Sequence, residues 1–166
     1  WYRGDLYQAE TLKLPPFTTL FCTTAAILLA EALPHLIQPA LKRLVAFSST
    51  SVITKQDSEV ASERAMIQRL AAAERQIAEL CEQHGIGWTI LRPTLIYAEG
   101  RDTNITPLSR LIRRFGFMPL VGGGPGLRQP VHAEDLAIGA IAAKPPKDLK
   151  ELVARFIHDH SARARN

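Results

Sequence analysis

Three short runs of apolar residues stand out from the mixed pattern of hydrophobic and polar positions along the chain. They span Thr18–Thr24, Arg43–Ser48 and Trp88–Leu91, and within each run the apolar side chains do not alternate strictly with polar ones. A strand that is buried on both faces has this pattern, because helices cover the sheet on either side. The three runs therefore predict buried strands of a parallel sheet.

Helical patterns fill the intervals between these strands. The clearest pattern covers Ser62–His84, where apolar residues recur at steps of three and four positions and Gly85 is placed to end the helix. A second helix is expected over Ala25–Leu41, interrupted or kinked near Pro34 and Pro39. Strands that alternate with helices favour an α/β fold, with helices on both faces of a parallel sheet and therefore three layers.

The pattern changes after the third strand. Thr106 and Pro107 are residue types typical of an N-cap and a first helical position, and the apolar stripe that follows them predicts a helix closed by Gly116. A short strand over Met118–Val121 and a small helix over Ala133–Ala143 are also expected. This half of the chain therefore contains fewer and shorter elements than the first half.

Two segments near the C-terminus complete the expected organisation. The loop Gly122–Gly126 is rich in glycine, but no Lys-Ser/Thr pair follows it and it contains no GxGxxG turn, so we interpret it as a surface loop. Residues 144–166 are expected to form one amphipathic helix, over Lys147–His158, and a tail.

Composition narrows the classes of function. The chain has 166 residues, of which 46% are hydrophobic and 22% charged, as in one globular domain. Part of its net charge of +4 comes from Arg110, Arg113 and Arg114. These arginines form either a solvated face or an anion-binding patch, and nucleic acid is the less expected partner because aromatic residues do not interleave with them.

The two cysteines and the longest apolar stretch indicate the cellular compartment of the protein and whether it spans a membrane. Cys22 and Cys81 form no CxxC pair, which predicts buried thiols in a reducing compartment, a cytoplasmic protein and no metal site. The stretch Phe17–Leu33 is shorter than the roughly 20 residues that a membrane span needs. No membrane partner is therefore expected.

Three segments resemble motifs of one superfamily, in the same order. Leu91–Tyr97 followed by Gly100 is similar to LRPxxVYGPG, Phe47–Val52 to SSxxVYG, and Arg128–Ala137 to RDxVHVxDLA. These are motifs of the extended and atypical short-chain dehydrogenase/reductases, the NAD-dependent epimerase/dehydratase group. The resemblance implies a Rossmann-like, NAD(P)-binding domain over residues 1–143, with substrate-side elements from about residue 101.

The resemblance also implies roles for individual residues. Thr50 matches the residue that hydrogen-bonds the reacting oxygen of the substrate, and Arg128 matches an arginine that holds a substrate phosphate. The positions that match cofactor-binding residues are Asp5, Leu6, Thr23, Thr24, Ala25, Ser48, Ser49, Pro93, Thr94 and Leu95. Two alternatives stay open, since the hydroxyl cluster from Ser48 to Ser51 can cap a turn and Arg128 can be a solvent-exposed charge.

The sequence departs from the family pattern in its chemistry. Reductases of this superfamily transfer a proton through a tyrosine whose pKa is lowered by a lysine four residues later. Alignment on Glu74 puts Met66 and Leu70 at these two places, and no tyrosine occurs between Tyr7 and Tyr97. The usual proton-transfer pair is therefore absent.

The other departure concerns the cofactor site. The glycine-rich turn that binds the dinucleotide diphosphate in this family has no counterpart from Trp1 onward. The chain is therefore expected to be N-terminally truncated, to lack the first βαβ unit and to form an incomplete Rossmann-like fold.

Two functions follow as hypotheses. The first is an NAD(P)-dependent oxidoreductase or isomerase of atypical type, which acts on a nucleotide sugar or a related phosphorylated small molecule. The second is a non-catalytic nucleotide-sensing or assembly subunit on the same fold. The choice between NAD and NADP, the substrate and the oligomeric state stay open at this point.

Overall fold

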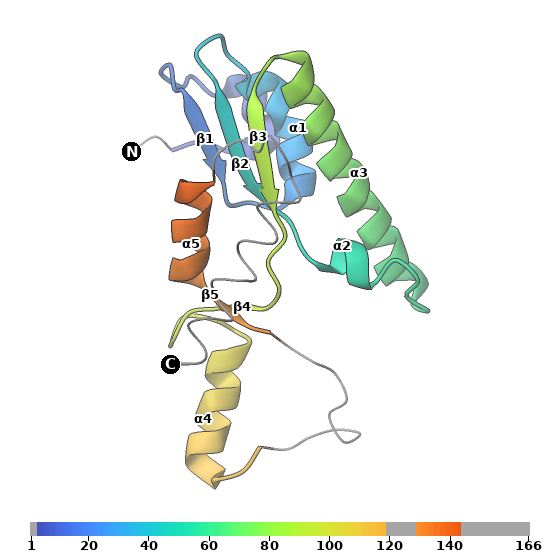
Figure 1. Ribbon diagram of the computed structural model, residues 1–166, viewed down its shortest axis with the longest axis vertical. Coiled ribbons are helices and arrows are strands. Elements are labelled where there is room, and N and C mark those ends of the chain that lie inside the picture. The colour runs from blue at the N-terminus through green and yellow to red at the C-terminus, as the bar shows by residue number, and fades with distance from the viewer. Residues whose placement is uncertain (1–2, 119–128, 144–166) are drawn as a thin grey trace. The chain divides into compact units, whose positions relative to one another are not determined.

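The computed structural model of the chain describes residues 3–118 and 129–143, and these divide into two compact units (Figure 1). The sheet unit contains the described residues up to Arg92 together with Ala142 and Ala143. The second unit contains the described residues from Pro93 to Ile141. Each unit is described separately below.

The sheet unit is organised around a parallel sheet of three strands, in the order β1 (Thr19–Cys22), β2 (Arg43–Phe47) and β3 (Gly87–Leu91). Cys22 lies opposite Ala46, which in turn lies opposite Ile90. The three strands predicted from the apolar runs are thus confirmed, each with slightly tighter bounds. Their parallel arrangement confirms an α/β fold at the level of a partial Rossmann-like sheet.

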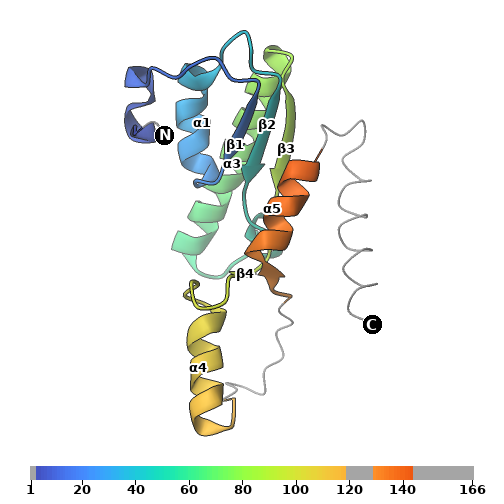
Figure 2. The same cartoon turned by 90° about the vertical axis from the view of Figure 1, so that its left-hand side faces the viewer.

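Two helices cover one face of this sheet. Helices α1 (Ala26–Leu36) and α3 (Ala61–Gln83) lie on the same side of the strands (Figure 2). One cluster of buried residues joins them to the strands, with Leu33, Leu44 and Ile77 fully enclosed. The described helices of the sheet unit therefore make two layers with the sheet, and the expected third layer stays a prediction.

Shorter helices complete the sheet unit. The 3₁₀ helix η1 (Leu6–Thr11) packs against α1, and Leu6 contacts the edge of the core. Helix α2 (Ser51–Thr54) follows β2 and leads toward α3. Among the described residues, no helix is long and apolar enough to cross a membrane.

Helix α3 ends as its sequence predicts. Gly85 has a φ of 65°, its N–H donates to the carbonyl of Glu82, and the N–H of Ile86 donates to the carbonyl of Cys81. This pattern is a Schellman motif, in which a left-handed residue satisfies the last carbonyls of a helix. Glycine adopts such a conformation without steric cost, so the sharp turn into β3 depends on it.

Helix α1 is shorter than expected and ends at Leu36 rather than Leu41. Pro34 lies in its last turn and has no N–H to donate to the carbonyl of Ala30. Instead, the side-chain amide of Gln76, on α3, donates to the Ala30 carbonyl over 3.1 Å. The proline thus frees an acceptor that binds the neighbouring helix.

The second unit contains a pair of very short parallel strands, β4 (Ile96–Tyr97) and β5 (Val131–His132). The rings of Tyr97 and His132 meet edge to face with their centroids 5.1 Å apart. Helices α4 (Ile105–Phe115) and α5 (Ala133–Ala142) complete the described elements. The two strands are absent from the sequence prediction, whereas the α5 segment was expected.

The expected start of α4 at Thr106 and Pro107 is wrong, because the helix already includes Ile105. The carboxylate of Asp102 accepts hydrogen bonds from the backbone N–H groups of Asn104, Ile105 and Thr106 and from the Thr106 hydroxyl. These bonds hold the pKa of Asp102 well below its usual range, the bond from the Thr106 hydroxyl being the largest cause. The expected end at Gly116, with a φ of 73°, is confirmed.

Several sequence predictions lie outside the described residues. They are the strand expected to begin at Met118, of which residues 119–121 are not described, the loop Gly122–Gly126, the site residue Arg128 and the helix Lys147–His158.

The bond between Gln76 and Ala30 can be tested by a double-mutant cycle. Gln76→Ala in the natural background should lower the free energy of unfolding by about 1 kcal/mol, because the Ala30 carbonyl loses its donor. In a Pro34→Ala background the new backbone N–H can bond the same carbonyl, so the cost of Gln76→Ala should fall. Urea titration followed by circular dichroism measures both costs, and an equal cost in the two backgrounds would contradict this role of Pro34.

Candidate functional site

The carboxyl ends of the three parallel strands place the expected site residues of the sheet unit along one edge. Thr23 and Thr24 follow β1, while Ser48, Ser49 and Thr50 follow β2. The arrowheads of β1, β2 and β3 point to the same edge (Figure 1). In open α/β sheets, ligands bind beyond this edge, so the hydroxyl groups are gathered where the fold favours a site.

The hydroxyl groups of Ser49 and Thr24 have local partners. The Ser49 hydroxyl lies 3.0 Å from the Ser51 hydroxyl and accepts the N–H of Ser51, at the first turn of α2. Thr24 Oγ1 lies 3.2 Å from the sulfur of Cys22. The turn-capping alternative from the sequence therefore describes what Ser49 does here.

Ser48 differs from its neighbours. Its N–H donates to the carbonyl of Leu91 over 2.8 Å and so extends the β2–β3 pairing beyond the ends of the two strands. Its hydroxyl oxygen is buried and has no hydrogen-bond partner among the described residues. Since buried hydroxyl groups in proteins are nearly always bonded, Ser48 is the member of the cluster best placed to bond a polar group at this edge.

Helix α3 supplies no proton-transfer group at the positions where the family has one. Met66 is half exposed, at 49%, and Leu70 packs against the apolar core. Helix α3 contains neither a tyrosine nor a lysine in its entire length. A thioether and an aliphatic side chain cannot donate or accept a proton at neutral pH.

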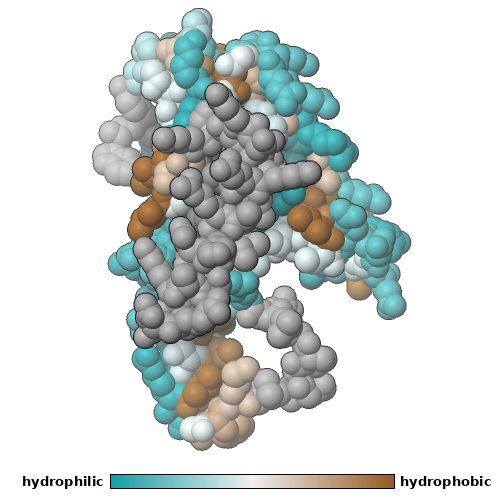
Figure 3. Space-filling view, in the orientation of Figure 1, coloured by the Kyte–Doolittle hydropathy of each residue, from teal (hydrophilic) through white to brown (hydrophobic). Residues whose placement is uncertain are grey.

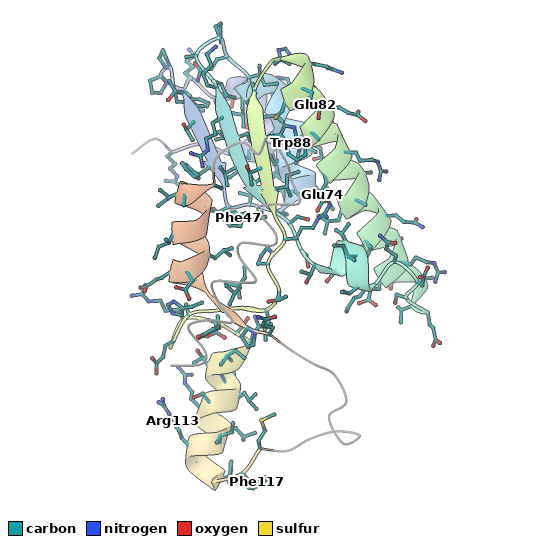
Figure 4. All side chains as sticks on the ribbon, viewed as in Figure 1. Phe47, Glu74, Glu82, Trp88, Arg113 and Phe117 are labelled. Atoms are coloured by element: carbon teal, nitrogen blue, oxygen red, sulfur yellow. The ribbon has the colours of Figure 1, made fainter. Side chains whose placement is uncertain are left out.

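Sequence reasoning missed the main charged contact of this edge. The guanidinium Nε of Arg92, directly after β3, donates to both carboxylate oxygens of Glu74 over 3.1 Å, and its terminal Nη2 also bonds the same carboxylate. Glu74 lies on α3 near the lower end of β3 (Figure 4), and its side chain is only 6% exposed. The hydrogen bonds to Glu74 raise the pKa of Arg92, so its positive charge is permanent. A carboxylate within the buried stripe of α3 was the available signal for this pair.

The expected nicotinamide-binding residues belong to the second unit. The Thr94 hydroxyl donates to the carbonyl of Gln129, and the Leu95 carbonyl accepts the N–H of Val131 over 2.9 Å. Pro93 is buried. These residues thus help to join β4 to β5, and their approach to the hydroxyl cluster stays a prediction.

The remaining expected cofactor residues have structural surroundings as well. The carboxylate of Asp5 accepts the N–H of Tyr7 over 2.9 Å and caps η1, and Leu6 packs at the edge of the core. Ala25 precedes α1, whose first N–H groups receive no side-chain cap. An adenine-binding role for Asp5 and Leu6 therefore stays a prediction.

The described residues fit only part of an NAD(P) molecule. The hydroxyl groups at the sheet edge suit a ribose, which offers both donors and acceptors. A diphosphate needs a glycine-rich turn that presents backbone N–H groups at a helix start, and the described strands lead into no such turn. The described residues also contain no group of three or more His, Cys, Asp or Glu that could hold a metal ion.

Comparison with known proteins gives one informative match. No family model matches the chain. Over 87 residues, the chain is 37% identical to NADH dehydrogenase (ubiquinone) 1 alpha subcomplex subunit 9, mitochondrial, from Arabidopsis thaliana. The match covers 52% of this chain and 20% of the relative, so the chain spans about a fifth of that protein's length. It supports the superfamily resemblance at a coarse level, that of an epimerase/dehydratase-like, NAD(P)-binding fold.

The pair of Glu74 and Arg92 should be important for stability. Arg92→Gln leaves the Glu74 carboxylate buried without a full counter-charge and should lower the free energy of unfolding by about 2–3 kcal/mol. This range is below that of a fully buried pair because the Arg92 side chain is 39% exposed. The matched control is Arg75→Gln, which changes an exposed arginine on α3, the helix that carries Glu74. Urea unfolding measures both variants, and equal midpoints for the two would contradict the anchoring role of the pair.

Proposed function

We propose that the chain is a non-catalytic subunit built on the epimerase/dehydratase-like fold and that it acts in the assembly of a larger complex. The observation that carries this proposal is the replacement of the proton-transfer pair on α3 by Met66 and Leu70. Hydride transfer to or from a carbonyl needs a group that moves a proton to or from the oxygen.

Neighbouring ionisable groups do not replace the missing pair. Lys55 is 2.5 Å from the carboxylate of Glu63, which also accepts the hydroxyl of Ser58. The hydrogen bonds from Lys55 and Ser58 lower the pKa of Glu63, so this carboxylate is ionised at neutral pH and is a poor proton donor. Thr50 alone can orient an oxygen atom, but it is too weak an acid to protonate one.

The similarity to a known protein also supports the proposed subunit role. Its name identifies it as a subunit of an NADH dehydrogenase (ubiquinone). We propose a comparable role for this chain, as a subunit whose Rossmann-like sheet is retained for packing between proteins. The two free cysteines suit a reducing compartment, which we propose as its location, whether the cytoplasm or the interior of an organelle.

A second candidate is an NAD(P)-dependent oxidoreductase or isomerase of atypical type. Its support is the buried, unbonded hydroxyl of Ser48 at the edge of the sheet, together with the three ordered motifs. Thr50 would orient the reacting oxygen, and Arg128 would hold a phosphate of a nucleotide sugar or a similar small molecule. When bound, NAD or NADP would accept a hydride in its oxidised form or donate one in its reduced form.

Isotope transfer separates the two candidates. The full chain is incubated with NADH or NADPH deuterated at the transferable position and with a panel of nucleotide sugars, and the products are analysed by mass spectrometry. We expect no deuterium in any sugar, because α3 has no tyrosine and no lysine to complete the proton transfer.

The matched variants make the opposite result interpretable. Thr54→Ala removes an exposed hydroxyl near Thr50 and serves as the control for Thr50→Ala. Deuterium transfer that Thr50→Ala abolishes and Thr54→Ala preserves would overturn the subunit proposal in favour of the enzyme.

A further inference from the structure

Helix α4 presents apolar side chains to solvent along one side. The apolar face, as we define it, consists of Leu108, Leu111, Ile112 and Phe115 with Phe117 and Met118 just beyond the helix. Phe115 is 53% exposed and Phe117 is 61% exposed, and their rings lie 6.2 Å apart. Steps of three and four residues place the helical members of this face on one stripe.

The opposite side of α4 carries only positive charge. Arg110, Arg113 and Arg114 are exposed, and no acidic residue occurs between Thr103 and Met118. The partner of Arg113 is Glu99, at 3.4 Å, in an ion pair that is largely solvent-exposed on both sides. Such an exposed pair contributes little, so the arginines retain most of their attraction for an external anion.

The described residues of the second unit leave much of the apolar face of α4 exposed. Both views of the ribbon show α4 extending away from β4 and β5 of the same unit (Figures 1 and 2). Thr106, in the first turn, is the only buried residue of the helix. The space-filling view shows apolar surface on one side of α4 and hydrophilic surface on the other (Figure 3). Arg113 lies to the left of α4, whereas Phe117 lies beyond the lower end of the helix (Figure 4).

We propose that α4 is a peripheral membrane-binding element that docks on an anionic lipid surface. Helices of this kind combine an apolar face that carries aromatic residues with an arginine-rich polar face, and they lie in the plane of the lipid headgroups. The proposal differs from the expectation of no membrane partner that the sequence suggested. It requires no membrane-spanning helix, and it does not depend on the proposed subunit role.

The positions of the arginines fit this arrangement. Successive helical residues are about 100° apart, which puts Arg114 nearest to a border of the apolar face and puts Arg110 and Arg113 on the side opposite this face. Their long aliphatic stems can lie along an acyl boundary while the guanidinium groups reach lipid phosphates. Each arginine near an anionic surface adds to the attraction.

Other acidic partners fit less well. A nucleic acid would pair with the arginines but would leave aliphatic residues such as Leu111 and Ile112 in water. A groove on an acidic protein would cover the apolar face but would not surround it with phosphate groups for the arginines. A lipid surface satisfies both faces at once.

Vesicle binding tests the proposal with the full chain. Vesicles of phosphatidylcholine with about 30% phosphatidylglycerol are compared with pure phosphatidylcholine by co-sedimentation. We expect binding to the anionic vesicles, and weaker binding at about 0.5 M NaCl because salt screens the arginines. The triple change Arg110→Gln, Arg113→Gln, Arg114→Gln and the double change Leu111→Ser, Phe115→Ser should each weaken binding about tenfold or more.

Matched controls change the same residue types elsewhere on the surface. The charge control is Arg3→Gln, Arg69→Gln, Arg75→Gln, and the apolar control is Ile53→Ser, Ile138→Ser, all at exposed positions. Circular dichroism verifies that every variant is folded. Absence of binding to anionic vesicles, or equal losses in the controls, would overturn the proposal. Binding to an oligonucleotide or to an acidic polypeptide in place of the vesicles would also overturn it and would identify α4 as a site for that partner.

Discussion

The contact between Glu74 and Arg92 joins α3, the longest of the described helices, to the point where β3 ends. Glu74 is the one charged residue that is buried among the described residues, and Arg92, directly after β3, donates hydrogen bonds to both of its carboxylate oxygens. A buried carboxylate without such a partner would be strongly destabilising. The pair therefore fixes α3 against the end of β3, directly before Pro93, the first residue of the second unit.

Helix α3 also packs against the hydrophobic core of the sheet unit. Ile77 and Cys81 are fully buried against the strands and α1, and burial raises the pKa of the Cys81 thiol to about 11. The side-chain amide of Gln76 donates to the Ala30 carbonyl of α1, which receives no N–H from Pro34. The same helix thus positions the sheet edge and lacks the groups that hydride transfer needs. Both features support the proposed subunit role, in which the fold is kept without the chemistry.

Much of the sheet unit could be predicted because its signals are local. Apolar runs gave the three strands, and the periodicity of α3 with Gly85 after it gave the long helix almost to the residue. The pair β4–β5 could not be predicted in this way, since each strand has two residues and its partner lies far along the chain. The start of α4 was misplaced because Thr106-Pro107 imitates an N-cap, whereas the actual cap is the carboxylate of Asp102, several residues upstream.

The candidate site shows a similar limit. The sequence placed the hydroxyl cluster directly after the second strand, and it lies after β2 in the structure. The motifs could not show that Ser49 bonds the first turn of α2 while the Ser48 hydroxyl has no partner among the described residues. Side-chain partners of this kind depend on exact geometry, and so does the Glu74–Arg92 pair.

The central claim is that the chain works as part of a larger assembly. The most direct measurement is native electrophoresis of membranes and soluble extract from the source cells, with the chain detected by an antibody and NADH dehydrogenase activity stained in the same gel. We expect the chain to migrate with the high-mass dehydrogenase band and to leave it only when the complex is dissociated. Migration as a free protein, with none of it in that band, would contradict the claim.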